Sequence, residues 1–190
     1  MTIKPLMTVS NMRYSLIREM DVSNGQGVGI SLFVQGCHFH CKGCFYQETW
    51  DFNGGKEWTE DIEDKFIKLA DRPYIKRISF LGGEPLADEN VSTVLRIIKK
   101  LKLLYPEKKI WIFTGYTWDS IINGSNISRI SAVNFADVVA DGQFQIENQD
   151  INNKQILWVG STNQRVIDVA KTIESNKIIT IEKDNYNGNN

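Results

Sequence analysis

The stretch "ISLFVQGCHFHCKGC", residues 30–44, runs from an apolar segment into all three cysteines of the 190-residue chain. A short apolar run that ends in glycine predicts a buried β-strand over 30–36. The strand leads directly into a loop in which Cys37, Cys41 and Cys44 have the spacing C-x3-C-x2-C. The sequence therefore predicts that three thiols lie together at the carboxyl end of a strand.

The pattern of a strand followed by a helix repeats along the chain. Segments 59–73 and 90–106 carry apolar residues at helical spacing, and the first of them begins with Thr59 and acidic residues, which is typical of a helix start. A short helix is predicted over 117–124. Further strands are predicted over 75–85, 109–116, 136–142 and 155–160, and 177–183 is a candidate for a last strand.

Strands that alternate with helices form parallel βαβ units, and the loops that follow parallel strands meet at one edge of the sheet. A closed eight-fold barrel needs about 250 residues, which is more than this chain has. We therefore expect an α/β fold in the form of a partial, open βα barrel with parallel strands, in preference to an open doubly wound sheet. We expect a single domain over 1–183, a polar insertion or hairpin over 142–155, and a disordered polar tail over 184–190.

The composition excludes some classes of partner. The chain has 22 Lys and Arg residues against 23 Asp and Glu residues, so it has no large field to attract nucleic acid or an anionic membrane. Its first 20 residues contain no apolar run long enough for a signal sequence, and we expect a cytoplasmic protein. In a reducing compartment, an odd number of clustered thiols favours a soft-metal site over disulfides.

The three cysteines leave two kinds of metal site open. A structural zinc ion needs four ligands, and because His40 is adjacent to Cys41, His38 would have to be the fourth. Otherwise we interpret both histidines as surface groups or as groups that lie next to metal ligands without binding the metal. A 4Fe-4S cluster held by three thiolates instead keeps one iron open. S-adenosylmethionine is a partner of such clusters in radical chemistry, and its amino and carboxylate groups could bind that iron.

Five segments of the chain carry a resemblance to known proteins. They are "GVGISLFVQGCHFHCKGCFYQETWDFNGG" (27–55), "SFLGGEPL" (79–86), "IWIFTGYTW" (110–118), "DVVADGQF" (137–144) and "GSTNQRVID" (160–168). Taken together, these segments resemble the radical S-adenosylmethionine superfamily, and within it the family of activating proteins of anaerobic ribonucleoside-triphosphate reductase. The resemblance implies a partial barrel of the radical S-adenosylmethionine type. It also implies reductive cleavage of S-adenosylmethionine to a 5′-deoxyadenosyl radical, a glycyl radical on the reductase, and a one-electron donor such as flavodoxin.

Two positions depart from the wider pattern. Many superfamily members have an aromatic residue before the third cysteine, where this chain has Gly43, although glycine is common in the activating proteins. Tyr46 stands where relatives usually have asparagine. By resemblance, we take Phe45 as the residue that covers the adenine.

The glycines of "LGGEP" let the backbone approach a ligand closely at the end of a strand. By resemblance, Gly82 and Gly83 receive the methionyl amino group and Glu84 supports them, while residues that end two further strands reach the ribose or the carboxylate. No side chain is needed as a catalytic acid or base. The predicted metal ligands are Cys37, Cys41 and Cys44, and the predicted cofactor-binding residues are Gly43, Cys44, Phe45, Gly82, Gly83, Glu84, Thr114, Asp141 and Gln143.

An open sheet edge suits a peptide loop of a partner protein better than a small substrate. We expect a docking surface made by Phe45, Tyr46, Trp50 and the loop 114–118, which includes Trp118. Two alternatives stay open at this point. One is a small radical enzyme that acts on a small-molecule substrate, and the other is a non-catalytic zinc-binding module.

Overall fold

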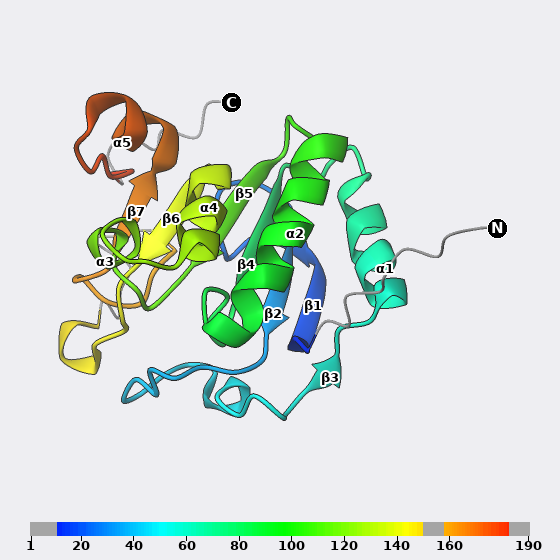
Figure 1. Cartoon of the computed structure of the whole chain (residues 1–190), viewed down its shortest axis with the longest axis horizontal. Helices are drawn as coiled ribbons and strands as arrows, with labels where there is room; N and C mark the ends of the chain where they lie inside the picture. The colour runs from blue at the N-terminus through cyan, green and yellow to red at the C-terminus, as the bar shows by residue number, and fades with distance from the viewer. Residues whose placement is uncertain (1–10, 150–157, 183–190) are drawn as a thin grey trace.

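The computed structural model describes residues 11–149 and 158–182, and these form one α/β unit around a single sheet (Figure 1). The strand order is β3-β1-β2-β4-β5-β6-β7. The four neighbours β2, β4, β5 and β6 are parallel, whereas β1, β3 and β7 run antiparallel to their partners. The strands are β1 (Arg13–Asp21), β2 (Gly29–Val34), β3 (Lys56–Glu57), β4 (Arg77–Gly82), β5 (Lys109–Phe113), β6 (Val138–Asp141) and β7 (Arg165–Asp168).

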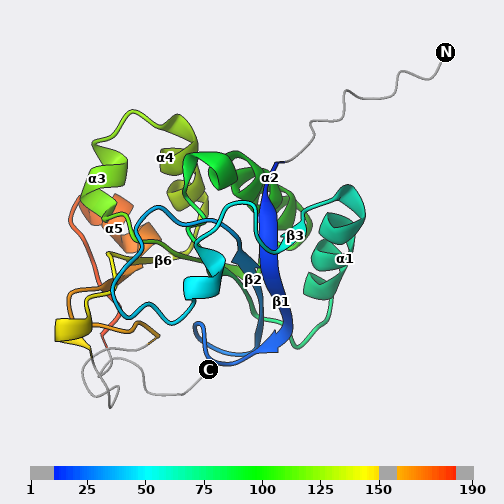
Figure 2. The ribbon, with the colours of Figure 1, turned by 90° about the horizontal axis from the view of Figure 1, so that it is seen from below.

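Helices cover one face of the sheet (Figures 1 and 2). The first begins where the Thr59 hydroxyl accepts a hydrogen bond from the backbone N–H of Ile62. None of the described helices is both long and apolar enough to cross a membrane. The helices are α1 (Glu60–Ala70), α2 (Asp88–Leu104), α3 (Trp118–Ile122), α4 (Ile127–Phe135) and α5 (Val169–Ser175), with short 3-10 turns η1 (Gln47–Thr49) and η2 (Ile146–Asn148).

Alternation along the central strands separates the two faces of the sheet. Ile78 and Phe80 of β4, and Ile112 of β5, are fully buried in the large core that also contains residues of α1, α2 and α4. The other face is partly polar, because Arg77 and Ser79 of β4 are also fully buried there. Side chains in strands alternate between faces, so the helix-covered face supplies most of the hydrophobic stabilisation.

The buried polar groups close the amino edge of the sheet. The Arg77 guanidinium donates to the Ser79 hydroxyl and to the backbone carbonyl of Asp21, both at 2.7 Å. The Ser79 hydroxyl in turn donates to the carbonyl of Asn24 at 2.7 Å. These bonds hold the loop between β1 and β2 beneath the sheet, and they satisfy carbonyl groups that would otherwise be costly to bury.

The expected order of strands and helices is largely confirmed. Strands overlap the predicted ranges 30–36, 75–85, 109–116 and 136–142, and helices overlap 59–73, 90–106 and 117–124, although β2 begins at Gly29 and α2 at Asp88. The expected α/β class with an open sheet is confirmed. The expected parallel strands are confirmed as β2, β4, β5 and β6, and two further strands, β1 and β7, extend them in antiparallel order.

The carboxyl-terminal strand predictions fare less well. Residues 177–182 form no strand, because the only pairing there is an isolated bridge between Thr180 and Ile167. The predicted strand 155–160 lies partly outside the described residues, and 158–160 is not a strand. The expected insertion over 142–155 contains η2 in its described part. The predicted tail 184–190 also lies outside the described residues.

Candidate functional site

The carboxyl ends of β2 and β4 bring the cysteine loop and the glycine loop into contact. The backbone N–H of Gly83 donates to the carbonyl of Val34 at 2.9 Å, and that of Glu84 donates to the carbonyl of Gly36 at 2.7 Å. A β-carbon on Gly83 would lie 2.4 Å from the Gly36 oxygen, so this approach requires glycine. The juxtaposition predicted from the parallel order of the strands is therefore confirmed.

The cysteine loop is closed by bonds near its base. The side-chain amide of Gln35 donates to the carbonyls of Glu48 and Asp51 at 2.9 and 2.8 Å. The backbone N–H of Cys37 donates to the carbonyl of Trp50 at 3.0 Å. These contacts join the two ends of the loop, so the positions of the thiols are fixed by its frame rather than by a metal alone.

Asn90 of α2 links this frame to the glycine loop. Its side-chain amide donates to the carbonyls of Gln35 and Glu84 at 2.9 and 3.0 Å. The sequence analysis did not identify Gln35 or Asn90. Gln35 could have been noticed as a polar residue at the end of an apolar strand. No sequence pattern indicates the role of Asn90.

The three cysteines are free thiols, and each is half-buried. Burial raises the pKa of the Cys37 thiol to about 11, although the N–H groups of Phe39 and His40 act in the opposite direction. The backbone N–H of Tyr46 donates to the Cys44 sulfur at 3.4 Å. Soft thiolates with N–H donors are suitable ligands for an iron-sulfur cluster, and the donor set of three fits a cluster with one iron left open.

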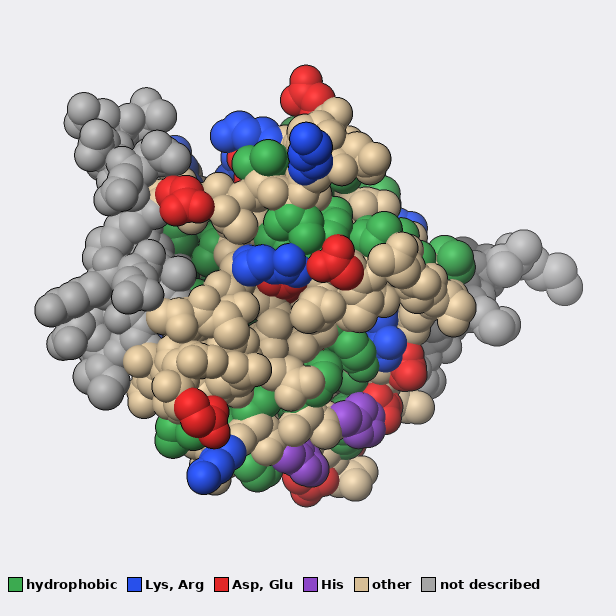
Figure 3. Space-filling model, turned by 90° about the vertical axis from the view of Figure 1, so that its left-hand side faces the viewer, with side chains coloured by type: hydrophobic (Ala, Val, Ile, Leu, Met, Phe, Trp, Pro, Cys, Tyr) green, Lys and Arg blue, Asp and Glu red, His purple; other side chains and the backbone are tan. Residues whose placement is uncertain are grey.

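The two histidines do not add to this donor set. Both are exposed, and Figure 3 shows them at the surface. The His38 ring nitrogen lies 3.0 Å from the Glu89 carboxylate, and the His40 ring packs on Trp50 with 4.7 Å between the ring centroids. No three His, Cys, Asp or Glu side chains in residues 11–149 and 158–182 are grouped around a single ion position. Their interpretation as surface groups is confirmed.

Glu84 is almost completely buried beside the site and ties two loops together. Its carboxylate accepts hydrogen bonds from the N–H groups of Leu86 and Gly115 and from the Thr114 hydroxyl, each at 2.8 Å. Burial raises the pKa of Glu84 to about 7, and these hydrogen bonds act in the opposite direction. The Thr114 hydroxyl is therefore directed at Glu84, within the loop framework.

Asp141, at the end of β6, is also buried, and both of its carboxylate oxygens accept hydrogen bonds. It accepts hydrogen bonds from the backbone N–H of Trp118 at 2.7 Å and from the Arg165 guanidinium at 2.5 and 3.0 Å. These contacts connect β6 with β7 and α3. Gln143 follows on the surface, and its backbone carbonyl accepts from the Asn163 side chain at 2.8 Å. Sequence analysis missed Arg165, which is distant from Asp141 along the chain.

The aromatic residues of the predicted docking surface differ in exposure. Phe45 is 61% exposed and packs on Phe144, with 5.2 Å between ring centroids. Trp50 is half-buried and Tyr46 packs on Phe33. Trp118 is only 7% exposed, because it belongs to the large core, and its prediction as a surface contact is wrong.

Gly43 occupies a position that few other residues could take. Its φ is +76°, in the left-handed region, and a β-carbon there would lie 2.6 Å from Cδ1 of Ile146. The absence of an aromatic residue before the third cysteine is therefore explained by the packing of the segment after β6 against the cysteine loop.

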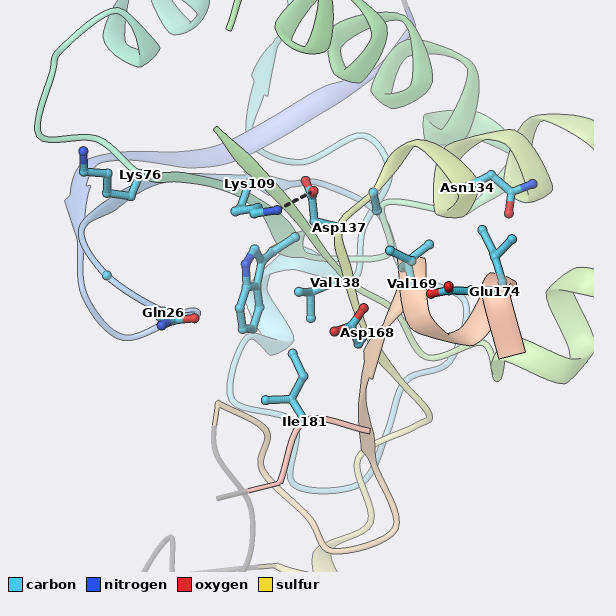
Figure 4. A pocket seen from close by; sticks show the side chains of 15 residues that line it. Gln26, Lys76, Lys109, Asn134, Asp137, Val138, Asp168, Val169, Glu174 and Ile181 are labelled. Atoms are coloured by element: carbon cyan, nitrogen blue, oxygen red, sulfur yellow. Dashed lines mark hydrogen bonds and ion pairs between the residues drawn. The ribbon is translucent and has the colours of Figure 1, made fainter. Parts of the chain in front are cut away.

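A cavity of about 650 Å³ lies at the opposite, amino edge of the sheet (Figure 4). Its lining includes Trp111, Val138 and Ile181, together with an ion pair of 3.2 Å between Lys109 and Asp137. None of the predicted site residues contributes to it. The candidate site is thus the loop cluster at the carboxyl edge and not this cavity.

Comparison with known proteins indicates the kind of domain. The family model of a "4Fe-4S single cluster domain" matches residues 23–167, which include the cysteine loop and the loops after β4, β5 and β6.

Curated relatives carry the name "Anaerobic ribonucleoside-triphosphate reductase-activating protein". The relative from Escherichia coli K12 is 36% identical over 157 residues, which cover 82% of this chain and 97% of the relative. The relative from Salmonella typhi is 37% identical over the same extent. That from Enterobacteria phage T4 is 31% identical over 155 residues, or 82% of this chain and 93% of the relative. Over nearly the whole length of these relatives, this chain belongs to the family of anaerobic ribonucleoside-triphosphate reductase-activating proteins.

Proposed function

We propose that this chain holds a 4Fe-4S cluster at Cys37, Cys41 and Cys44, cleaves S-adenosylmethionine reductively, and generates a glycyl radical on anaerobic ribonucleoside-triphosphate reductase. The observation that carries the proposal is the contact between the three-cysteine loop and the glycine loop, in which Glu84 N–H donates to the Gly36 carbonyl at 2.7 Å. The open sheet then serves as a partial barrel of the radical S-adenosylmethionine type.

When bound, the cluster supplies one electron that breaks the bond between sulfur and the 5′ carbon of S-adenosylmethionine, which yields methionine and a 5′-deoxyadenosyl radical. The side chains and backbone of this chain bind and orient S-adenosylmethionine. Gly82 and Gly83 let the backbone reach the methionyl amino group, since neither carries a side chain. Phe45 is the candidate cover of the adenine, and Gly43 and Cys44 bring it to the cluster loop.

The remaining predicted residues divide into two groups. Glu84, Thr114 and Asp141 direct their polar atoms at neighbouring loops, which favours a positioning role over direct contact with the cofactor. Gln143 is exposed at the same edge, and its side chain is the candidate contact for the ribose or the carboxylate. No side-chain acid or base takes part in the bond cleavage.

The partner is the anaerobic reductase, and a one-electron donor such as flavodoxin supplies the electron. The names of the relatives support the reductase as partner. The docking surface is the apolar group beside the cysteine loop that consists of the exposed Phe45 and Ile146 and the half-buried Phe144. Apolar and aromatic groups are favourable in the centre of a protein interface.

The test is anaerobic reconstitution followed by three measurements. We expect about four irons per chain, 5′-deoxyadenosine after addition of reductant and S-adenosylmethionine, and a carbon-centred doublet on the reductase in electron paramagnetic resonance. Cys37→Ala, Cys41→Ala and Cys44→Ala should each abolish the cluster, because three thiolates are already the minimum. Lys42→Ala, an exposed change in the same loop, should keep it.

The same measurements detect the alternatives. Zinc in place of iron and sulfide would show a zinc-binding module. Cleavage that consumes a small substrate, with no radical on the reductase, would show a small-molecule enzyme.

To separate docking from cleavage, Phe45→Ala and Ile146→Ala should be compared for both yields. If Phe45 covers the adenine, Phe45→Ala should lower both the yield of 5′-deoxyadenosine and the yield of radical on the reductase. If Ile146 belongs to the docking surface, Ile146→Ala should lower only the yield of radical on the reductase.

A further inference from the structure

The segment after β6, residues 142–149, lies directly on the cysteine loop. Ile146 fills the space beside Gly43, and the Phe144 ring packs on Phe45. Gly43 and Phe45 flank Cys44, so the segment covers the side of the loop between Cys41 and Cys44, two of the predicted cluster ligands.

A second segment, residues 160–164, holds the first one in place. It belongs to the motif "GSTNQRVID", for which the proposed function gives no role. Gln164 and Asn163 each donate a side-chain hydrogen bond to a backbone carbonyl of the covering segment. The bonds that join the two segments are Gln164 Nε2 to Gly142 O at 2.9 Å, Asn163 Nδ2 to Gln143 O at 2.8 Å, Gln145 N to Ser161 Oγ at 3.1 Å, and Thr162 N to Asn148 O at 2.8 Å.

The amide of Gln164 serves both segments at once. Its oxygen accepts from the backbone N–H groups of Gly160 and Ser161 at 3.0 and 3.2 Å, which fixes its own turn. Its nitrogen then crosses to the covering segment. Gly160 is confined in the same way, since a β-carbon there would lie 2.9 Å from the Phe45 ring and 3.0 Å from the Phe144 ring. The turn, the covering segment and the cysteine loop therefore pack as one unit.

We propose that residues 160–164 are a brace that holds segment 142–149 over the Cys41–Cys44 side of the cluster loop, and that Gln164 and Asn163 are its positioning residues. The inference rests on the proposed function only in taking the cysteines as cluster ligands. The brace keeps water away from that side. Solvent exposure is a determinant of the reduction potential of an iron-sulfur cluster.

Two isosteric substitutions remove bonds between the segments by replacing an amide with a carboxylate. Gln164→Glu keeps the acceptor for Gly160 and Ser161 but loses the donor to Gly142, and Asn163→Asp loses the donor to Gln143. Thr162→Ala is the matched control, because the Thr162 side chain is exposed and the bond to Asn148 uses its backbone. Two rates are measured anaerobically in the reconstituted protein: iron transfer to a chelator, and amide hydrogen exchange in 142–149 and 41–46.

We expect Gln164→Glu and Asn163→Asp to accelerate both rates about tenfold, because each loses a hydrogen bond that opposes local opening. Thr162→Ala should leave both within about twofold of the unmodified protein. Exchange in β2 and α2 should not change in any variant.

Unchanged rates in both isosteric variants would overturn the proposal. Equal acceleration in β2 and α2 would overturn it as well, because the residues would then stabilise the whole fold and not the cover. Neither measurement needs S-adenosylmethionine, and hydrogen exchange needs no cluster. Failure of the proposed function and failure of the brace are therefore distinguishable.

Discussion

Two buried carboxyl groups at opposite edges of the same sheet have pKa values that are shifted in opposite directions. Asp21, at the amino edge, accepts hydrogen bonds from Ser31, Asn24 and Ser23 beside the Arg77 guanidinium. Burial acts to raise the pKa of Asp21, but these partners outweigh burial and lower it. Glu84, at the carboxyl edge, accepts hydrogen bonds from neutral groups, and burial raises its pKa to about 7.

The difference shows what each edge of the sheet does. At the amino edge, the ion pair of Arg77 and Asp21 and its hydrogen bonds hold the loop between β1 and β2 against the sheet. These charges stabilise the fold. At the carboxyl edge, Glu84 orients the loops that frame the cysteines, although its own ionisation is unfavourable. Groups with strongly shifted pKa values concentrate at functional sites, in agreement with the position of Glu84.

The largest effect is expected at the amino edge. Arg77→Met removes a fully buried cation and leaves the Asp21 charge without it, which should lower the free energy of unfolding by about 3–5 kcal/mol. Denaturation by urea under anaerobic conditions measures this loss. The yield of 5′-deoxyadenosine per folded molecule should be unchanged, because Arg77 belongs to the other edge.

Two further variants test the reason for that loss. Asp21→Asn in the Arg77→Met background should recover part of the stability, since no buried charge is then left alone. Asp64→Asn removes an exposed pair with Lys100 and should change the free energy of unfolding by less than about 1 kcal/mol. A loss of the same size in Asp64→Asn and Arg77→Met would contradict the contrast between buried and exposed charges.

The next effect is a pH dependence from Glu84. Its pKa rises from 4.5 in the unfolded chain to about 7 in the folded chain. Between these values the folded state binds the proton more tightly, so this group's contribution to stability is full below pH 4.5 and is lost as the pH rises through 7. The loss is about 3 kcal/mol at most. Glu84→Gln should abolish it.

The measurement is the free energy of unfolding between pH 5 and 8 for both proteins in the same cluster state. Asp21→Asn provides the comparison of opposite sign, which is measured at lower pH, below 5. The lowered pKa of Asp21 gives stability that is present above the unfolded pKa of 3.8 and is lost as the pH falls through the folded pKa. Parallel curves for wild type and Glu84→Gln would show that Glu84 does not titrate in this range.

The smallest effect is expected from the packing of Gly43. Gly43→Ala places a β-carbon 2.6 Å from Cδ1 of Ile146 in a left-handed backbone. Because Cδ1 is the end of a side chain that can shift, we expect a loss of about 1–2 kcal/mol, mostly from the backbone. Urea denaturation measures this loss. Adding Ile146→Ala should remove only the steric part, and a full recovery would show that the backbone strain is negligible.

Prediction from sequence worked where the signal is local. The apolar runs predicted β2, β4, β5 and β6, because strands that are buried on both faces are mostly apolar. It failed for β1, whose mixed burial reflects a strand near the margin of the sheet, and for β7, whose pairing with β6 is antiparallel. Trp118 was placed at the surface because a loop aromatic gives no local sign of burial.

The sequence alone determined which chemistry is possible at this site. It contains three thiols on one short loop, two glycines at the end of a neighbouring strand, and strands that bring both to one edge. These features depend on covalent spacing and on the parallel order of the chain. Only the tertiary structure decided which distant residues hold these loops by hydrogen bonds. Asn90 donates to the carbonyl of Gln35, Arg165 donates to the carboxylate of Asp141, and Gln164 donates to the carbonyl of Gly142. A hydrogen bond between remote residues depends on distances that exist only after folding, so no local pattern specifies it.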